Sequence, residues 1–243
     1  MLLRKLIKLK NIVINLNQFR CYCEKFVKYE RIIAHETEIV NNELVPEIKL
    51  HLITPNCKLY YSKIDESIPF KNDPFFLIFW IGGIALTRFV LDNPGIVKSK
   101  TILDFGSGCG SLSIAAKMCG AKIAVANDID EVSIIAAQMN ARLNNVIIDT
   151  EIRNLIDHPD SFSYDIVFFG DVFYDEEFAS TLLPWIENLL EKKKRVFIGD
   201  PGRHGFKVCR NLNLTQLQQY LLPENVKNEN NGFEFGYVWE VQR

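Results

Sequence analysis

The sequence of 243 residues has few of the features that mark a metal site, a redox motif or a membrane span. Its six cysteines are scattered and include no C-x-x-C pair, so their spacing predicts neither a zinc site nor a thioredoxin-like motif. The longest apolar run, residues 75–86, is interrupted by Gly82 and Gly83. That run is shorter than the ~20 residues that cross a bilayer. We therefore expect no metal ion and no membrane-spanning helix.

An excess of positive charge is also absent. The chain has 28 Lys and Arg against 30 Asp and Glu, which gives a formal net charge of −2 and an isoelectric point of about 6.1. Domains that bind nucleic acid usually have a basic face and a basic isoelectric point. The composition therefore argues against nucleic acid as a partner. A hydrophobic content of 48% is typical of a globular core.

Acidic residues are missing from the first 23 positions, which contain five basic residues. At ~100° per residue, most apolar side chains of this stretch share one side of a helix and most basic ones the other. No apolar run in it exceeds three residues, which excludes a secretory signal. The pattern resembles a mitochondrial transit peptide, although serine is absent. We expect residues 1–23 to be a transit segment and the protein to reside in the mitochondrial matrix; the alternative is an amphipathic helix of the fold.

Residues 24–100 form a predicted helical and β extension that packs on the core. Residues 24–43 are rich in charge and indicate an exposed helix. Residues 48–55 and 58–63 are predicted as two β segments separated by the turn signal Pro55-Asn56. Residues 80–94 are predicted as a helix that ends before Pro94.

From residue 101 to 243, apolar strands alternate with helices. Because the strands are apolar throughout, the pattern predicts a doubly wound, mostly parallel α/β sheet of the Rossmann type, covered on both faces. Alternation in 233–242 predicts an antiparallel last strand, whereas 214–222 fits helix or strand. The other predicted strands are 101–106, 122–127, 146–152, 164–170 and 195–200, and the helices are 110–119, 131–143 and 176–192.

The end of the first core strand is rich in glycine. Asp104 ends an apolar run and is followed by Gly106, Gly108 and Gly110. Glycines at such a position permit positive φ and close approach of the backbone to a ligand. A dinucleotide fingerprint requires its third glycine one position later, where this chain has Ser111. Asp104 fits instead a ligand with a cationic amino group and no pyrophosphate, such as S-adenosylmethionine.

Polar residues also follow the next two strands. Asp128 comes directly after an apolar strand, where a carboxylate accepts hydrogen bonds from a ribose diol. Asp130 lies two residues later and is interpreted as a helix cap. Asn154 lies where an adenine amino group needs a hydrogen-bond acceptor. An Asx turn explains an asparagine at this position equally well.

The fourth strand ends in "FFGDVFYDEE", residues 168–177. The strand would deliver Asp171 to the reactive end of the ligand, with Tyr174 beside it. The alternatives are that Asp171 caps the helix that starts near residue 175 and that Tyr174 is a packing residue. Asp175, Glu176 and Glu177 are interpreted as first-turn acids favoured by the helix dipole.

Four motifs together carry a family resemblance. "LDFGSGCG", "ANDID", "GDVFYDE" and "FIGDPGR" resemble those of seven-β-strand, class I S-adenosylmethionine-dependent methyltransferases of the protein-lysine branch. "PEIKLHLITP", "FWIGGIALTRFVLDNP", "AAKMCGA" and "DVFYDEEFA" are similar to the mitochondrial group that methylates the electron-transfer flavoprotein β subunit. The resemblance extends from about residue 44 to 243.

The resemblance implies a seven-stranded sheet, S-adenosylmethionine as cofactor and a protein substrate, the electron-transfer flavoprotein β subunit. It assigns the cofactor's methionine part to Asp104 and the glycines, its ribose to Asp128 and its adenine to the vicinity of Asn154. Asp171 and Tyr174 match the acid-x-x-aromatic motif at the target-lysine channel, and charge logic favours Asp171 as a group that orients lysine rather than a strong base. The implied cofactor-binding residues are Trp80, Asp104, Gly106, Gly108, Gly110, Asp128 and Asn154, and the implied catalytic residues are Asp171 and Tyr174.

Other functions compete with this hypothesis. The chain could methylate another protein, a nucleic acid or a small amine, but "DVFY" lacks the two prolines of the motif typical of amino-group nucleic-acid methyltransferases. A non-catalytic binding protein with the same fold is the third alternative. The retention of Asp104, the glycine set and Asp171 speaks against it.

Overall fold

A seven-stranded sheet forms the centre of the computed structural model, which describes residues 16–62, 68–229 and 232–243. Its strand order is β5-β4-β3-β6-β7-β9-β8, and β9 runs antiparallel to both of its neighbours. This confirms the predicted doubly wound, mostly parallel sheet with an antiparallel last strand. The strands are β3 (Thr101–Phe105), β4 (Ile123–Asn127), β5 (Asp149–Glu151), β6 (Ile166–Gly170), β7 (Arg195–Asp200), β8 (Asn213–Leu221) and β9 (Phe235–Gln242).

The chain changes direction across the sheet between β3 and β6. It builds β3, β4 and β5 outward on one side and then returns to place β6 against the other side of β3. In open α/β sheets, ligands bind beyond the carboxyl ends of the strands at such a switch point. The topology therefore brings the ends of β3, β4 and β6 to one place.

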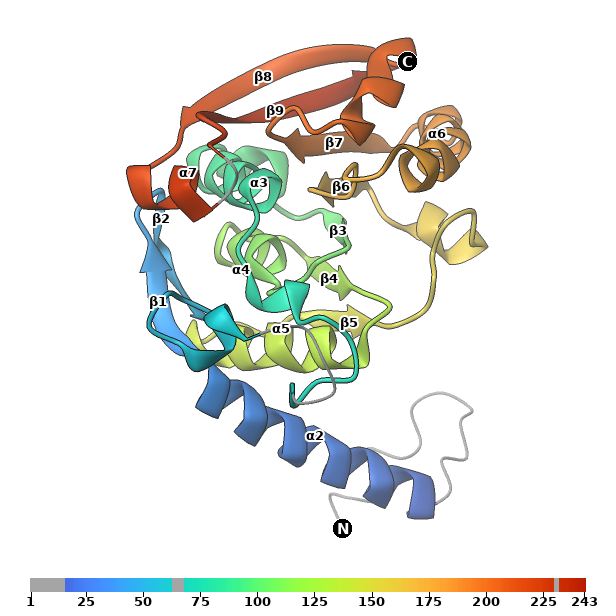
Figure 1. Cartoon of the computed structure of the whole chain (residues 1–243). Coiled ribbons are helices and arrows are strands. Elements are labelled where there is room, and N and C mark those ends of the chain that lie inside the picture. The colour runs from blue at the N-terminus through green and yellow to red at the C-terminus, as the bar shows by residue number, and fades with distance from the viewer. Residues whose placement is uncertain (1–15, 63–67, 230–231) are drawn as a thin grey trace.

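Helices cover both faces of the sheet (Figure 1). Ile102 and Phe168 point to the face of α3 (Ile81–Asp92), α4 (Ser111–Met118) and α5 (Glu131–Leu143), whereas the adjacent Leu103 and Phe169 point to α6 (Glu176–Glu191). Because successive side chains of a strand point to opposite faces, both sets are buried. This explains why the inner parallel strands β3 and β6 are largely apolar, whereas the edge strand β5 (DTE) is polar. A further short helix, α7 (Glu224–Glu229), lies between β8 and β9 in the chain.

The start of α3 packs against β7 backbone to backbone. A Cβ atom built on Gly82 would lie 2.0 Å from the carbonyl oxygen of Gly199, and one on Gly199 would lie 2.2 Å from that of Gly82. Any side chain at either position would force the helix away from the sheet. The two glycines therefore place the first turn of α3 directly over the ends of β6 and β7.

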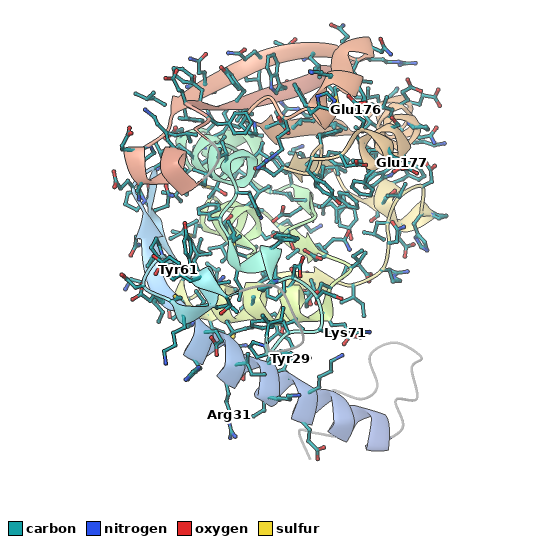
Figure 2. The ribbon with its side chains drawn as sticks, in the orientation of Figure 1. Tyr29, Arg31, Tyr61, Lys71, Glu176 and Glu177 are labelled. Atoms are coloured by element: carbon teal, nitrogen blue, oxygen red, sulfur yellow. The ribbon has the colours of Figure 1, made fainter. Side chains whose placement is uncertain are left out.

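The amino-terminal part differs from the prediction for residues 24–43. The helix α2 runs from Leu16 to Glu36, and residues 38–42 form β1 (Glu38–Asn42), which pairs antiparallel with β2 (Val45–Leu52). The predicted helix is confirmed for residues 24–36, although Ile33 is fully buried, and is wrong for residues 38–42, where Ile39 and Val40 favour a strand. In Figure 2, Tyr29 lies on the side of α2 that faces α5, whereas Arg31 points away.

The predicted transit segment lies mostly outside the described residues, which begin at residue 16. Its predicted end at residue 23 falls inside α2, which continues without interruption to Glu36. In the part of the chain that the structure describes, no helix is both long and apolar enough to cross a membrane.

Two other predicted segments have different outcomes. Residues 58–63 were predicted as β structure, but Lys58–Tyr61 forms a 3-10 helix. Successive hydrogen bonds from Tyr60 N to Cys57 O and from Ser62 N to Leu59 O keep this segment in tight turns. The ambiguous stretch 214–222 lies almost entirely in strand β8, which pairs with β9 from Asn213 to Leu221 at the edge of the sheet, with one irregularity between Gln216 and Gln218.

The other 3-10 helices are short and lie in the connections. They are Phe75–Leu77, Pro94–Ile96, Pro159–Ser163 and Gly205–Asn211.

Candidate active site

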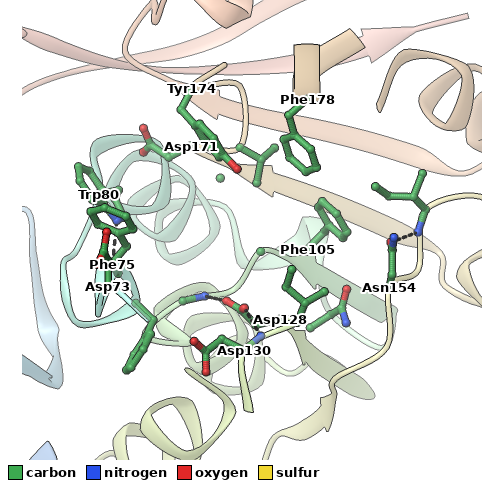
Figure 3. Close-up of a pocket in the computed structure, with 18 of the residues that line it drawn as sticks. Asp73, Phe75, Trp80, Phe105, Asp128, Asp130, Asn154, Asp171, Tyr174 and Phe178 are labelled. Carbon is green, nitrogen blue, oxygen red and sulfur yellow. Dashed lines mark hydrogen bonds between the residues drawn. The ribbon is translucent and has the colours of Figure 1, made fainter. Parts of the chain in front are cut away.

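A cavity of about 590 Å³ lies beyond the carboxyl ends of β3, β4 and β6. Its volume is within the range of roughly 300–1,000 Å³ that is usual for small-molecule sites. Figure 3 shows Asp171 and Tyr174 on one side of it and Asp128 and Asp130 on the other. The lining residues are Asp73, Phe75, Phe76, Trp80, Phe105, Gly106, Gly108, Asn127, Asp128, Ile129, Asp130, Asn154, Ile156, Gly170, Asp171, Val172, Tyr174, Phe178 and Arg203.

The glycine-rich loop after β3 provides one wall. Gly106 and Gly108 line the cavity with φ angles of +66° and +50°, a conformation that side chains disfavour. Gly110 is not among the described lining residues. It is the N-cap of α4, and a Cβ there would lie 2.7 Å from that of Ala137 in α5. Two of the three glycines therefore face the cavity, and the third permits two helices to pack closely.

Asp104 lies behind this loop and is likewise not among the described lining residues. Its Oδ2 atom accepts hydrogen bonds from the backbone N–H of Ser113 at 3.1 Å and from the Ser113 hydroxyl at 2.9 Å. Burial is the main cause that raises the pKa of Asp104 to about 7. In this geometry, Asp104 ties α4 to the glycine loop and reaches the cavity only through that loop.

Asp128 and Asp130 follow β4 and have different partners. Asp128 Oδ2 accepts from Gly108 N at 3.2 Å and from the Ser133 hydroxyl at 2.8 Å, while Oδ1 accepts from Asp130 N at 3.0 Å. Burial raises the pKa of Asp128 above its ordinary value. Asp130 is the N-cap of α5, because its Oδ1 accepts from Val132 N at 2.7 Å. The capping interpretation of Asp130 is confirmed.

Asn154 lines the cavity on the side of β5. Its side-chain oxygen accepts from the backbone N–H of Ile156 at 3.0 Å, which is the Asx turn that the sequence left open. A carbonyl oxygen has a second lone pair, so this contact leaves an acceptor site. The Asx turn fixes the position of that acceptor at the cavity wall.

Asp171 follows β6 with a φ angle of +55° and is largely buried, with 6% of its side chain exposed. Its Oδ1 pairs with Arg203 Nε at 2.6 Å. Its Oδ2 accepts from the backbone N–H groups of Gly82 and Gly83 at the start of α3, the latter at 3.3 Å. The alternative that Asp171 caps α6 is wrong, since Asp175 caps that helix by accepting from Phe178 N at 2.9 Å.

Two aromatic side chains flank Asp171. Tyr174 is 62% exposed, and its ring stacks on Phe178 with centroids 5.7 Å apart. Trp80, the N-cap residue of α3, donates its indole N–H to the carbonyl of Phe75 at 2.9 Å. Both line the cavity. Glu176 and Glu177 occupy the exposed first turn of α6, as predicted (Figure 2).

Arg203, which comes from the turn after β7, was not predicted as a site residue. Its guanidinium lies 5.3 Å from the centre of the Trp80 ring, and its backbone N–H donates to Asp200 Oδ1 at 2.7 Å. Asp200 is fully buried, and its Oδ1 also accepts from Gly202 N at 2.6 Å. Burial first, and then the charge of Asp171, raise the pKa of Asp200 to about 7. The only available signal was the position of "DPGR" at the end of a strand.

Apolar residues of the cavity were also missed. Phe75 and Phe76 come from a 3-10 turn before α3, and Ile129 and Ile156 follow β4 and β5. They lie in irregular segments, where hydrophobic periodicity gives no signal. In the described residues, no group of acids, histidines and cysteines is arranged to hold a metal ion.

Comparison with curated proteins identifies the family. The chain is 41% identical over 217 residues to the electron transfer flavoprotein beta subunit lysine methyltransferase of Mus musculus, covering 88% of this chain and 84% of that protein. The Homo sapiens protein of the same name is 39% identical over 219 residues, covering 86% of this chain and 80% of its own. The chain belongs to this family. A Caenorhabditis elegans homologue of these methyltransferases is 36% identical over 233 residues and is covered to 94%.

Two further comparisons agree with a methyltransferase fold. The family model for ribosomal protein L11 methyltransferase (PrmA) matches residues 86–170, which contain the glycine loop, Asp128 and the end of β6. A solved structure from Streptococcus mutans, described as a candidate SAM-dependent methyltransferase, has a TM-score of 0.51 and 15% identity. The match covers 85% of this chain and 56% of the Streptococcus mutans chain. The chain therefore has the class I methyltransferase fold.

Proposed function

We propose that the chain transfers methyl groups from S-adenosylmethionine to lysine side chains of the electron-transfer flavoprotein β subunit in the mitochondrial matrix. The relatives that carry this substrate in their name support the choice of protein. The observation that carries the proposal is one cavity with Asp128 on one side and Asp171 and Tyr174 on the other. When bound, the cofactor supplies a methyl group on a positively charged sulfur.

The residues present fit this cofactor. Gly106 and Gly108 leave the loop free of side chains at the cavity wall. Asp128 Oδ1 accepts one hydrogen bond, so it has room for one from a ribose hydroxyl. Ile129 and Ile156 provide apolar surface for an adenine ring, with the acceptor oxygen of Asn154 nearby. Asp104 supports the methionine end indirectly by fixing the loop through Ser113.

The lysine would enter on the side of Tyr174 and Phe178. Their stacked rings form an apolar wall against which the methylene groups of a lysine side chain pack. Gly170 lines the cavity at the end of β6, where an added Cβ would lie 3.4 Å from the backbone of Gly83, and Asp171 lies beside it. In this assignment Asp171 and Tyr174 are the residues nearest the reacting amine. Orientation of two reactants in this way can contribute ~7–11 kcal/mol to a reaction barrier.

We further propose the domain division predicted from the sequence. Residues 1–23 act as a transit segment, residues 24–100 form an extension, and residues 101–243 form the methyltransferase core. The contact of α2 with α5 through the ion pair of Lys25 with Glu131 supports packing of the extension on the core. A fluorescent fusion of residues 1–35 is expected to enter mitochondria, and cytosolic retention would contradict import.

The test is a methylation assay with purified components. The chain is incubated with S-adenosylmethionine labelled in its methyl group and with purified electron-transfer flavoprotein, and intact-mass and peptide mass spectrometry follow. We expect label on lysines of the β subunit and none with Asp128→Ala, which removes the proposed ribose contact. Parallel reactions contain a mitochondrial extract, total RNA, DNA or polyamines. Label only in one of those would reassign the substrate, and absence of label everywhere would support a non-catalytic binding protein.

A further inference from the structure

Both oxygens of the Asp171 carboxylate already have partners within the protein. Arg203 Nε lies 2.6 Å from Oδ1, and the backbone N–H groups of Gly82 and Gly83 donate to Oδ2. Arg203 has 15% and Asp171 6% of its side chain exposed, so little water screens the pair. A carboxylate held in this way has little free capacity to bind an incoming ammonium ion.

Arg203 is fixed from several directions. Its guanidinium lies 5.3 Å from the ring centre of Trp80 and 5.8 Å from that of Phe233. Asp200, at the end of β7, accepts from the backbone N–H groups of Gly202 and Arg203. The arginine therefore reaches the end of β6 from a turn that a second buried acid holds in place.

The cavity has an uneven charge. Among its described lining residues, four are acids and one, Arg203, is a cation. Unpaired carboxylates favour the ammonium form of a nearby lysine, because an opposite charge stabilises the charged state. Methyl transfer requires the other form, since only the neutral amine has a lone pair to donate.

This inference rests on the proposed function. We propose that Arg203 is a positioning residue: it pairs with Asp171 and thereby favours the amine form of the substrate lysine. The lysine nitrogen then forms the new bond to the methyl carbon as the bond to sulfur breaks, and the electron pair of that bond stays on sulfur. The methylated ammonium product gives up its proton to water. Arg203 acts through charge and through the orientation of Asp171, without bonding to the reacting atoms.

The electrostatics of the pair agree with this role. Burial raises the pKa of Asp171, while the charge of Arg203 and its hydrogen bond lower it. Arg203 thus helps to keep Asp171 ionised and engaged. The other titratable or charged groups that line the cavity or surround the pair are Asp73, Asp128, Asp130, Tyr174, Asp200 and Cys209.

The experiment compares pH profiles of turnover with the flavoprotein substrate, from about pH 6 to about pH 10, toward the ordinary lysine pKa of ~10.4. The variants are Arg203→Met and Arg203→Lys, with Arg195→Met as the matched control. Arg195 pairs with Glu240 at the opposite end of β7, so its loss also removes an Arg–carboxylate pair but not one at the cavity. Each profile is fitted for the apparent pKa of its acidic limb.

We expect Arg203→Met to move the acidic limb up by about one pH unit or more, the usual effect of a nearby charge. Turnover at neutral pH then falls ~10-fold and recovers at high pH. Arg203→Lys keeps the charge, so its limb stays near that of the parent, and Arg195→Met leaves the profile unchanged. An Arg203→Met rate that falls by the same factor at every pH, or a limb that does not move, overturns the proposal.

A double variant covers the case in which Arg203→Met does not fold. Asp171→Asn with Arg203→Met removes both charges and leaves no buried ion without a partner. Its acidic limb is expected near that of the parent, and a limb shifted upward contradicts the proposal. Methylation by the parent protein is read in the same assay, so a failure of the proposed function appears in the parent and is distinct from a failure of this inference.

Discussion

Arg203 Nε lies 2.6 Å from Asp171 Oδ1, which joins the turn after β7 to the end of β6. From the sequence, Asp171 is expected to orient the lysine, and no role is expected for Arg203. The ion pair changes how Asp171 acts, because its carboxylate is neutralised from within the protein. Asp171 therefore also links β6, α3 and the turn after β7.

Asp171→Asn is expected to lose both turnover and stability. Loss of the charge that holds Arg203 and the start of α3 misplaces the groups around the reacting amine, which lowers turnover by ~10²-fold, while cofactor affinity stays close to that of the parent. Arg203 is left without its partner, and breaking a buried pair in this way costs about 3–5 kcal/mol of the free energy of unfolding. Turnover, calorimetry and urea denaturation measure the three quantities.

The matched control for that variant is Asp175→Asn. Asp175 caps α6 through Phe178 N, and Asn is an equally good cap. We expect it to keep both stability and turnover. Parental turnover in Asp171→Asn would show that Asp171 has a structural role alone.

Asp128→Asn is expected to weaken S-adenosylmethionine binding by ~10–100-fold. A hydrogen bond to a charged group contributes about 1.5–3 kcal/mol, and its loss has an effect of this size. Asp130→Asn should bind as the parent does, since Asn caps α5 as well as Asp. Titration calorimetry of both variants measures the difference. Equal loss in the two would mean that the acidic character of this edge, rather than Asp128, holds the cofactor.

Gly199→Ala is expected to destabilise the fold by about 1–3 kcal/mol or more, the usual cost of overpacking. The added Cβ would lie 2.2 Å from the carbonyl oxygen of Gly82 and would push α3 off β7. Gly95→Ala is the control, because a Cβ there meets no atom within 4 Å. Chemical denaturation should separate the two variants, and equal stability would refute the close packing of α3.

Stability should depend less on pH in Asp200→Asn than in the parent. The pKa of Asp200 is raised from 3.8 to about 7, so the native state favours its protonated form. The stability from this group is complete below about pH 4 and is lost as pH rises through about 7, by at most about 1.36 kcal/mol per unit. Asn cannot ionise, so its stability relative to the parent should rise between these values.

Urea denaturation of the two proteins at about pH 4, 5.5 and 8 measures this difference. Contributions from buried acids that do not interact with Asp200, such as Asp104, are present in both proteins and cancel in the comparison. A constant difference at all three values would show that Asp200 does not change its protonation on folding.

The inner parallel strands were predictable because they are apolar on both faces, as Ile102 and Leu103 illustrate, whereas the edge strand β5 is polar. The polar residues that follow these strands could be assigned to one site, because the carboxyl ends of parallel strands meet at one edge of the sheet. The pairing of Asp171 with Arg203 was not, because it depends on two loops that are adjacent only in the folded chain. Residues 58–63 were misassigned because Tyr60 and Tyr61 favour a strand, although local turns decide their conformation.

The roles of Asp104 and Gly110 illustrate a second limit. The glycine motif predicts where a ligand binds, but not which of its residues touch the ligand and which hold the loop. Here Asp104 contacts Ser113, and Gly110 lets α4 approach α5. Such a division depends on packing between helices, which the motif alone does not encode.

The most direct test of the account is a crystal structure of the chain with S-adenosylhomocysteine bound. We expect the ligand in the cavity beyond β3, β4 and β6, with its ribose on Asp128, its adenine between Ile129 and Ile156, and its sulfur toward Asp171 and Tyr174. Binding in this place with the opposite orientation, or at another surface, would contradict the assignment of the active site.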